Sequence, residues 1–100
     1  VYLDGMVQPI TSVYQNIAHQ AYCLKHPLTL LDPDLHITKV NSQTRTKILQ
    51  GNYPGPCIVI ASSGMLIGGK SVEYAKAFAG ERRNAIFISG YQDEESPGRR

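Results

Sequence analysis

Serine and glycine residues that could hold a phosphate group lie together in one stretch of the chain. An apolar run at residues 57–61 leads into the Ser- and Gly-rich stretch 62–71, and a helical pattern follows. Backbone N–H groups at the start of a helix have no intrahelical partner and attract anions, and glycine lets the backbone approach them closely. The stretch therefore predicts a phosphate-binding loop between a strand and a helix.

One specific interpretation of this loop is nucleotide binding. Gly64, Gly69, Lys70 and Ser71 satisfy the G-x-x-x-x-G-K-[ST] pattern, in which the lysine contacts the β- and γ-phosphates and the serine binds magnesium. The next predicted strand ends in Ser89-Gly90, however, where such enzymes need an acidic residue for the metal. A nucleotide-binding domain that uses residues 64–71 is therefore kept as an alternative.

A second group of candidate binding residues follows that next strand. Tyr91 offers a ring for stacking, Gln92 offers hydrogen bonds, and two terminal arginines offer guanidinium groups that pair with phosphate oxygens. A strand, a crossover helix and a second strand form a right-handed unit, so both loops emerge at the carboxyl edge of the sheet, where ligands bind. We therefore expect a combined RNA- and phosphate-binding site made of Ser62, Ser63, Gly64, Met65, Gly68, Gly69, Tyr91, Gln92, Arg99 and Arg100.

The elements that position these loops follow from hydrophobic periodicity. We expect strands at residues 1–3, 37–40, 57–61 and 85–88 and helices at 6–25, 41–50 and 71–78, the last capped by Ser71. The continuous apolar run at 57–61 is typical of a strand buried on both faces of a parallel sheet. The fold class predicted is α/β, a three-layer α/β/α sandwich fragment with a mainly parallel sheet.

The first helix is expected to begin at Asp4 as its cap and to pack one face into the core. That face carries apolar residues at helical spacing. They are Ile10, Val13, Tyr14, Ile17, Ala18, Ala21, Tyr22 and Leu24.

The order and type of these motifs resemble the β-CASP domain of metallo-β-lactamase-type nucleases. The resemblance is carried by residues 60–69, 71–74 and 83–92 and by the closing Pro97-Gly98-Arg99-Arg100, and residues 1–7 are similar to the family's first strand. It covers nearly the whole chain and is weakest at residues 25–50. It implies that residues 1–100 are a single β-CASP domain fragment of a larger enzyme that also contains a metallo-β-lactamase domain.

The same resemblance implies a function for the longer protein. Family members are zinc-dependent ribonucleases, endonucleases or exonucleases of RNA processing and decay, in which the loop corresponding to residues 62–69 lies near the scissile phosphate. The resemblance implies that the zinc ligands, an H-x-H-x-D-H run, belong to the other domain, and no such run occurs here. We therefore expect no catalytic or metal-binding residue in this chain and no activity from it alone. The resemblance implies that the first histidine motif of the family falls near Arg100, and because arginine cannot bind zinc, that motif is either displaced beyond the chain or absent. Some relatives of this family keep the fold but have lost metal ligands, so a non-catalytic scaffold relative is a further alternative.

The composition limits the classes of protein to which this chain can belong. The chain has 42% hydrophobic and 18% charged residues, which indicates a folded globular domain, and no run is long and apolar enough to cross a membrane. A cytoplasmic protein is expected. A formal charge of +2 permits RNA binding without requiring it. An apolar flank, uncovered where another domain belongs, would make self-association into a homodimer unsurprising.

The remaining polar residues have plain structural interpretations. Cys23 and Cys57 belong to no C-x-x-C pair and are expected to be reduced thiols. The acidic trio 93–95 is expected to be a solvated loop, although Glu94 could orient a water or Arg99. Solvated turn or surface positions are expected for Asp32, Asp34, His36, His19 and His26, and an extension of the RNA track is a weaker interpretation of Lys39, Arg45 and Lys47.

Overall fold

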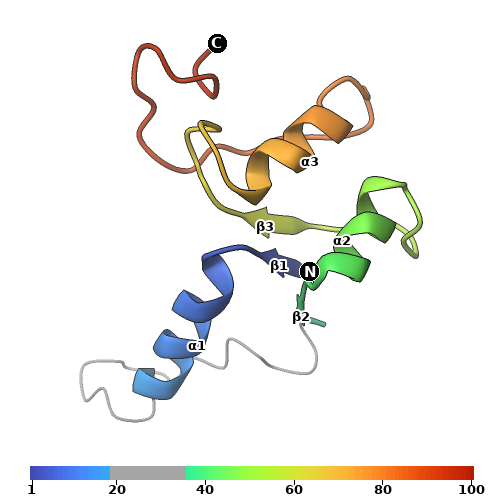
Figure 1. The fold of residues 1–100 in the computed structure, drawn as a ribbon, viewed down its shortest axis with the longest axis vertical. Coiled ribbons are helices and arrows are strands. Elements are labelled where there is room, and N and C mark those ends of the chain that lie inside the picture. Colours follow the sequence, from blue (N-terminus) through green and yellow to red (C-terminus); the bar gives the residue numbers. More distant parts are fainter. Residues whose placement is uncertain (19–35) are drawn as a thin grey trace.

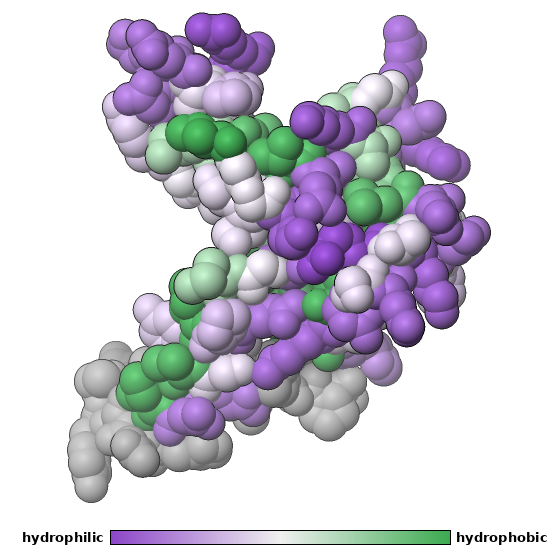
Figure 2. Space-filling view, in the orientation of Figure 1, coloured by the Kyte–Doolittle hydropathy of each residue, from purple (hydrophilic) through white to green (hydrophobic). Residues whose placement is uncertain are grey.

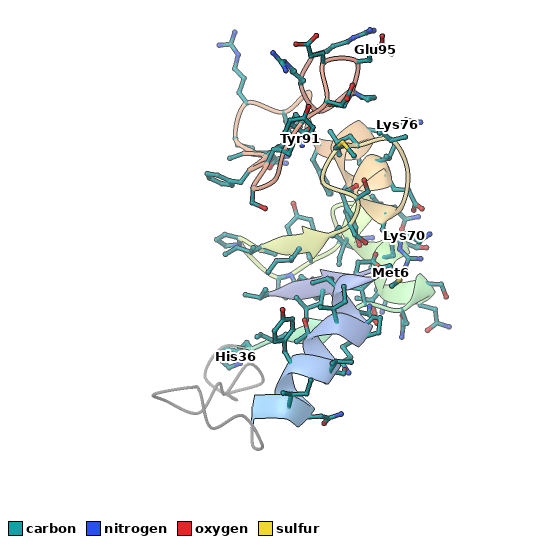
Figure 3. All side chains as sticks on the ribbon, turned by 90° about the vertical axis from the view of Figure 1, so that its left-hand side faces the viewer. Met6, His36, Lys70, Lys76, Tyr91 and Glu95 are labelled. Carbon is teal, nitrogen blue, oxygen red and sulfur yellow. The ribbon has the colours of Figure 1, made fainter. Side chains whose placement is uncertain are left out.

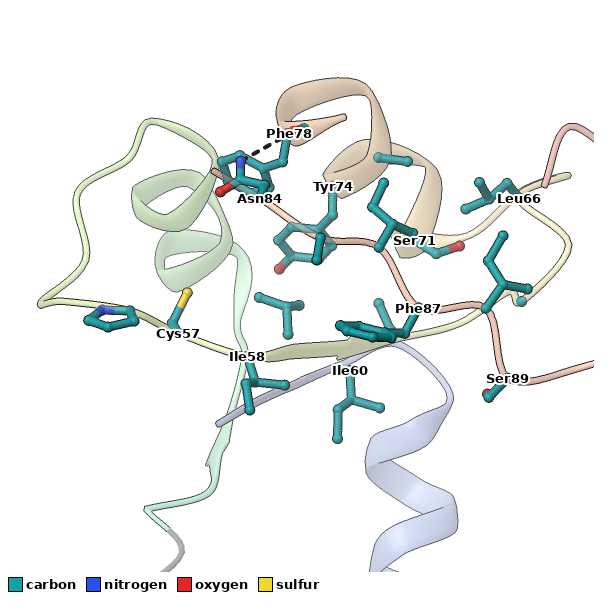
Figure 4. A pocket seen from close by; sticks show the side chains of 18 of the residues that line it. Cys57, Ile58, Ile60, Leu66, Ser71, Tyr74, Phe78, Asn84, Phe87 and Ser89 are labelled. Carbon is teal, nitrogen blue, oxygen red and sulfur yellow. Dashed lines mark hydrogen bonds between the residues drawn. The ribbon is translucent and has the colours of Figure 1, made fainter. Parts of the chain in front are cut away.

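The fold is built on a small parallel sheet with helices on both faces. A computed structural model describes residues 1–18 and 36–100. In chain order the elements are β1 (Tyr2–Asp4), α1 (Val7–Ala18), β2 (Thr38–Lys39), α2 (Ser42–Leu49), β3 (Val59–Ala61) and α3 (Lys70–Phe78). The strand order is β2-β1-β3, and both neighbours run parallel to β1. Helix α1 lies on one side of the sheet, and α2 and α3 lie on the other (Figures 1 and 4). The predicted α/β class with a parallel sheet is confirmed.

Several element predictions are confirmed in position. The short strand expected at 37–40 is β2, and the helix expected from Asn41 is α2, whose first turn is capped by the Asn41 side chain accepting a hydrogen bond from the Thr44 N–H at 2.8 Å. The first helix begins at Val7, one residue after its predicted start at residue 6. Its expected continuation to residue 25, with Ala21, Tyr22, Cys23 and Leu24, lies outside the described residues.

Two predicted caps are wrong. Helix α3 begins at Lys70 with Gly69 as its N-cap, and Ser71 lies inside the first turn, where its hydroxyl donates to the Ser63 carbonyl instead of capping. Gly69 has a φ of 78°, a conformation that glycine adopts without a steric penalty. Asp4 does not cap α1 either, because its carboxylate is buried and binds side chains from α2 and α3.

The expected strand at 85–88 is absent from the described part of the chain. Residues 84–89 have no regular structure, and Phe87 is 90% exposed. The segment is held at both ends: the Asn84 side chain donates to the Phe78 carbonyl at 3.2 Å, and the Gln92 side chain donates to the Gly64 carbonyl at 3.1 Å. These contacts hold the segment across from β3 (Figure 4), but the segment does not pair with it. Strand β3 is therefore an edge strand of the sheet.

The core lies on the side of the sheet that α2 and α3 cover. Val40, Ile48 and Tyr74 are buried there, with Tyr2, Val59 and Phe78 among the residues packed against them. The other side is more open. The run 57–61 was predicted to be buried on both faces. Ile58, just before β3, and Ile60 within it instead point toward α1, where they are 63% and 45% exposed (Figure 4).

The apolar stripe of α1 is also exposed, so its assignment to the core is wrong for the described residues. Ile10, Val13, Tyr14 and Ile17 are each about half exposed, from 49% to 60%. Apolar surface accordingly follows α1 toward the lower left of Figure 2. The radius of gyration is 15.1 Å, against about 13 Å for a compact domain of this length. The chain is therefore less compact than is usual for its length.

Candidate functional site

A buried hydrogen-bonded group fixes the elements that carry the candidate site. The Asp4 carboxylate, which is completely buried, accepts two hydrogen bonds from the Arg45 guanidinium at 2.6 and 2.7 Å and one from the Tyr74 hydroxyl at 2.7 Å. These three side chains come from β1, α2 and α3. The group therefore ties the start of α3, and the loop that precedes it, to the central strand.

Electrostatics within this group favour the charged carboxylate. Burial raises the pKa of Asp4, but hydrogen bonds from Arg45 and Tyr74 and the Arg45 charge outweigh it and hold the pKa below its ordinary value. Burial and the Asp4 carboxylate raise the pKa of Tyr74. The interpretation of Arg45 as part of an RNA track is wrong, because its guanidinium is engaged in this ion pair. No local pattern could have revealed the group, since its members are 41 and 70 residues apart in sequence.

The loop at residues 62–69 closes on itself and on the turn between β1 and α1. The Ser62 hydroxyl accepts a hydrogen bond from the Met6 N–H at 3.1 Å, and the Ser62 carbonyl accepts one from the Ser71 N–H at 2.9 Å. Gly69 lies close to Ser62, such that a side-chain Cβ placed on it would be 2.7 Å from the Ser62 carbonyl oxygen. The loop is therefore held in a defined shape by its own backbone, and Ser62 contributes to that shape.

The two predicted loops do meet. Besides the hydrogen bond from Gln92 to Gly64, the Gly98 N–H donates to the Met65 carbonyl at 3.2 Å. The segment between these contacts folds around Ser96, whose side chain is 2% exposed and whose hydroxyl lies 2.8 Å from the Asp93 carbonyl oxygen. Two segments almost thirty residues apart in sequence thus form one surface.

The candidate binding side chains divide into two groups on this surface. Gln92 is used to dock the two segments, and Ser63 and Met65 are half buried. Tyr91 is 78% exposed, and the two terminal arginines are exposed as well. Figure 3 shows Tyr91 and Glu95 at the end of the molecule opposite α1, with Lys70 lying apart from them. The arrangement offers an aromatic ring and two guanidinium groups to a ligand, with Gly64, Gly68 and Gly69 exposed on the neighbouring loop.

The groups that would hold a nucleotide phosphate are engaged elsewhere. Lys70 forms an ion pair with Glu73 at 2.8 Å, and both the N–H and the hydroxyl of Ser71 donate to loop carbonyls. The N–H of Ser63 donates to the Gly68 carbonyl at 3.4 Å. A phosphate cradle needs such donors to converge on the ligand. The geometry therefore weighs against the nucleotide-binding alternative.

Metal ligands are not clustered in the part of the chain that the structure describes. Within residues 1–18 and 36–100 no three His, Cys, Asp or Glu side chains lie together as a metal site would require. Cys57 is a free, half-buried thiol whose pKa is raised by burial. His36 is exposed, while His19, His26, Asp32 and Asp34 lie outside the described residues. Zinc needs three or four such ligands, so the described residues do not fit a zinc site of their own. None of the described helices is long and apolar enough to span a membrane.

A large apolar cavity of about 990 Å³ opens between β3, α3 and the segment 83–89. Val59, Ala61, Tyr74 and Phe78 form its inner wall, and Phe87 leans over β3 on the other side (Figure 4). Polar side chains, among them Ser71, Arg83 and Asn84, also line it, and at Ser63 and Gly64 it borders the loop described above.

Comparison with known proteins gives a consistent result. A family model described as the Beta-Casp domain matches residues 1–100. The chain is 39% identical over its whole length to the transcription termination factor FttA of Methanosarcina mazei, and 34% identical to FttA of a Lokiarchaeum species. It is 32% identical, over 99% of its length, to a probable RNase of Methanocaldococcus jannaschii named MJ4. The chain spans 16% of the length of the two termination factors and 23% of the RNase.

Proposed function

The chain belongs to the β-CASP family, and on that premise we propose that it is the RNA-clamping part of a metal-dependent ribonuclease of RNA processing or decay. The proposal is supported most directly by the surface on which Gln92 contacts Gly64 and Gly98 contacts Met65. That surface presents Tyr91, Arg99 and Arg100 to solvent. Aromatic stacking and guanidinium–phosphate contacts are the interactions by which proteins hold single-stranded RNA.

The clamp holds RNA in position and does not itself catalyse cleavage. Its rigid base is the loop at 62–69. The hydrogen bond between Met6 and Ser62 and the hydrogen bond between Tyr74 and Asp4 tie this loop to β1 and to the turn after it. The exposed arginines neutralise phosphate charge, and the Tyr91 ring stacks on a base. Cleavage of the phosphodiester bond, as an endonuclease or an exonuclease, belongs to the longer protein.

The proposed metal lies outside this chain. We propose that zinc is bound by a metallo-β-lactamase domain on the same polypeptide, because the described residues supply no cluster of metal ligands. This chain spans 16% to 23% of the length of the relatives, which leaves room for such a domain. A cytoplasmic location is part of the same proposal.

The proposal predicts different behaviour for the chain and for the longer protein. The chain alone is expected to bind RNA without cutting it, while the longer protein contains zinc and cuts RNA. A longer protein that binds RNA but lacks zinc and activity would favour the scaffold alternative.

The clamp is tested by binding of fluorescent single-stranded RNA to the chain over a salt series. We expect affinity to fall with salt, and the slope of log K against log salt to shrink by roughly one unit or slightly less for each arginine removed in Arg99→Ala/Arg100→Ala. Arg82→Ala/Arg83→Ala is the matched control, since it removes the same charge from exposed positions between α3 and residue 84. Equal losses in both variants, or no salt-dependent binding, would contradict the proposal.

The nucleotide-binding alternative is tested in the same experiment with labelled ATP. The ion pair between Lys70 and Glu73 is exposed and contributes little, so Lys70→Ala is expected to leave RNA binding unchanged. ATP is expected not to bind to the wild-type chain. Tight ATP binding that is lost in Lys70→Ala would establish the phosphate-loop interpretation instead.

A further inference from the structure

The loop at 62–69 contains an apolar stretch that phosphate binding does not explain. Met65 and Ile67 lie in this loop, and Ile67 is 66% exposed. Exposed apolar side chains at a polar binding surface need an apolar partner to be favourable. Across from them lie Tyr91 and Pro97, and the four side chains line a cavity of about 500 Å³. Its volume falls within the range of small-ligand pockets.

The rim of this cavity carries acceptors and no basic side chain. Asp93 and Glu95 line it, and the other lining residues with polar side-chain atoms are the buried Ser96 and Tyr91, through its hydroxyl. One Asp93 carboxylate oxygen accepts the Glu95 N–H at 3.0 Å, which leaves the other oxygen and the Glu95 carboxylate for a ligand. Ionised carboxylates only accept hydrogen bonds. The pocket therefore suits a flat apolar group that carries donors on its edge.

The pocket is also preorganised. The Ser96 N–H donates to the Asp93 carbonyl at 3.0 Å, and the Arg99 N–H donates to the Ser96 carbonyl at 3.1 Å. The Gly98 contact with Met65 joins this turn to the opposite wall. A side-chain Cβ on Gly98 would lie 3.3 Å from the Met65 carbonyl oxygen of the opposite wall, so glycine suits this close approach. Because these bonds hold the backbone of both walls, little backbone entropy is lost when a ligand enters.

From these observations we propose that the cavity between Met65, Ile67 and Tyr91 is a nucleobase pocket that selects guanine in single-stranded RNA. The ring stacks on Tyr91 between the apolar side chains, and its adjacent N1–H and N2–H groups donate to the carboxylates of Asp93 and Glu95. Uracil presents one N–H between two carbonyl oxygens, which the carboxylates repel. The inference rests on the proposed RNA-binding function and adds a base preference to it.

The test measures binding of the chain to short oligouridines that carry one central test base. With guanine at that position we expect affinity roughly tenfold higher than with uracil, and inosine, which lacks the 2-amino group, should lie between them. The double variant Asp93→Asn/Glu95→Gln should lose this preference and, because it also removes the repulsion of uracil, should bind oligouridine at least as tightly as the wild type. Tyr91→Leu should weaken binding of every oligonucleotide.

Glu94→Gln is the matched control, because Glu94 lies between the two rim residues, is exposed and does not line the cavity. It should keep the guanine preference. RNA binding with equal affinity for all test bases, or a preference that survives in the double variant, would contradict the proposed guanine pocket but not the proposed RNA clamp. Absence of RNA binding altogether would overturn both.

Discussion

The hydroxyl of Tyr74 donates a hydrogen bond of 2.7 Å to the carboxylate of Asp4, seventy residues earlier in the chain. Asp4 ends β1, and Tyr74 lies in α3 on the covered face of the sheet. With Arg45 on the same carboxylate, the contact joins the central strand to the two helices that enclose the core. The stability of the described fold should depend on it.

Removing either partner of this contact should lower the free energy of unfolding. Tyr74→Phe loses one hydrogen bond to a charged group, at a cost of about 2 kcal/mol. Asp4→Ala leaves the Arg45 guanidinium largely buried without its partner, and should cost about 3 to 5 kcal/mol. Urea denaturation followed by circular dichroism measures both, and the double variant should cost less than the sum of the two. Strict additivity would contradict an interaction between these side chains.

The same group predicts how stability depends on pH. The pKa of Asp4 is lower in the folded chain than its ordinary 3.8, so its contribution is complete above about that pH and is lost as the pH falls through the lower folded value. The pKa of Tyr74 is raised above its ordinary 10.0, so its contribution is complete below pH 10 and is lost as the pH rises further. Urea midpoints measured across this range should form a plateau that falls off at both ends.

Tyr74→Phe is the control for the alkaline side of that profile. It removes the titrating hydroxyl while keeping the ring, so the loss of stability above pH 10 should be smaller than in the wild type. A wild-type midpoint that rises as the solution becomes more acidic would contradict the assigned direction for Asp4.

Gly69→Ala should distort the loop that precedes α3. The position has a φ of 78°, and the new Cβ would be 2.7 Å from the Ser62 carbonyl oxygen. We expect a loss of about 1 to 3 kcal/mol in the free energy of unfolding, together with weaker RNA binding. Gly80→Ala is the matched control, since no atom lies within 4 Å of its added Cβ. An unchanged stability in Gly69→Ala would show that the loop adopts another shape.

The exposed stripe of α1 predicts self-association of the chain. Val13 and Ile17 are 54% and 50% exposed on one helix face, beside the uncovered side of β3. Sedimentation over a wide concentration range should show association that Val13→Gln/Ile17→Gln reduces, because apolar burial is the driving force. Asn16→Ser, an exposed change on the same helix away from the stripe, should leave it unaltered. A wild-type chain that stays monomeric throughout would refute the homodimer expectation.

How far the sequence could predict the fold differs from element to element. The helix beginning at Asn41 was predictable because an N-cap interaction is made within three residues. The segment 84–89 was not, although its apolar β-branched residues favour a strand. A strand must also pair with a sheet edge. The contacts of Asn84 with Phe78 and of Gln92 with Gly64 hold this segment across from the edge strand β3, and it does not pair with it.

The candidate site shows the same division. The sequence alone determined the α/β class, the Gly- and Ser-rich loop before α3 and the family resemblance, because each depends on residue types at short spacing. Only the tertiary structure decided that Arg45 binds Asp4, that Lys70 binds Glu73 and that Gln92 docks one loop on the other. A side chain is available to a ligand only when no nearer partner takes it, and those partners are brought close by the packing of elements far apart in sequence.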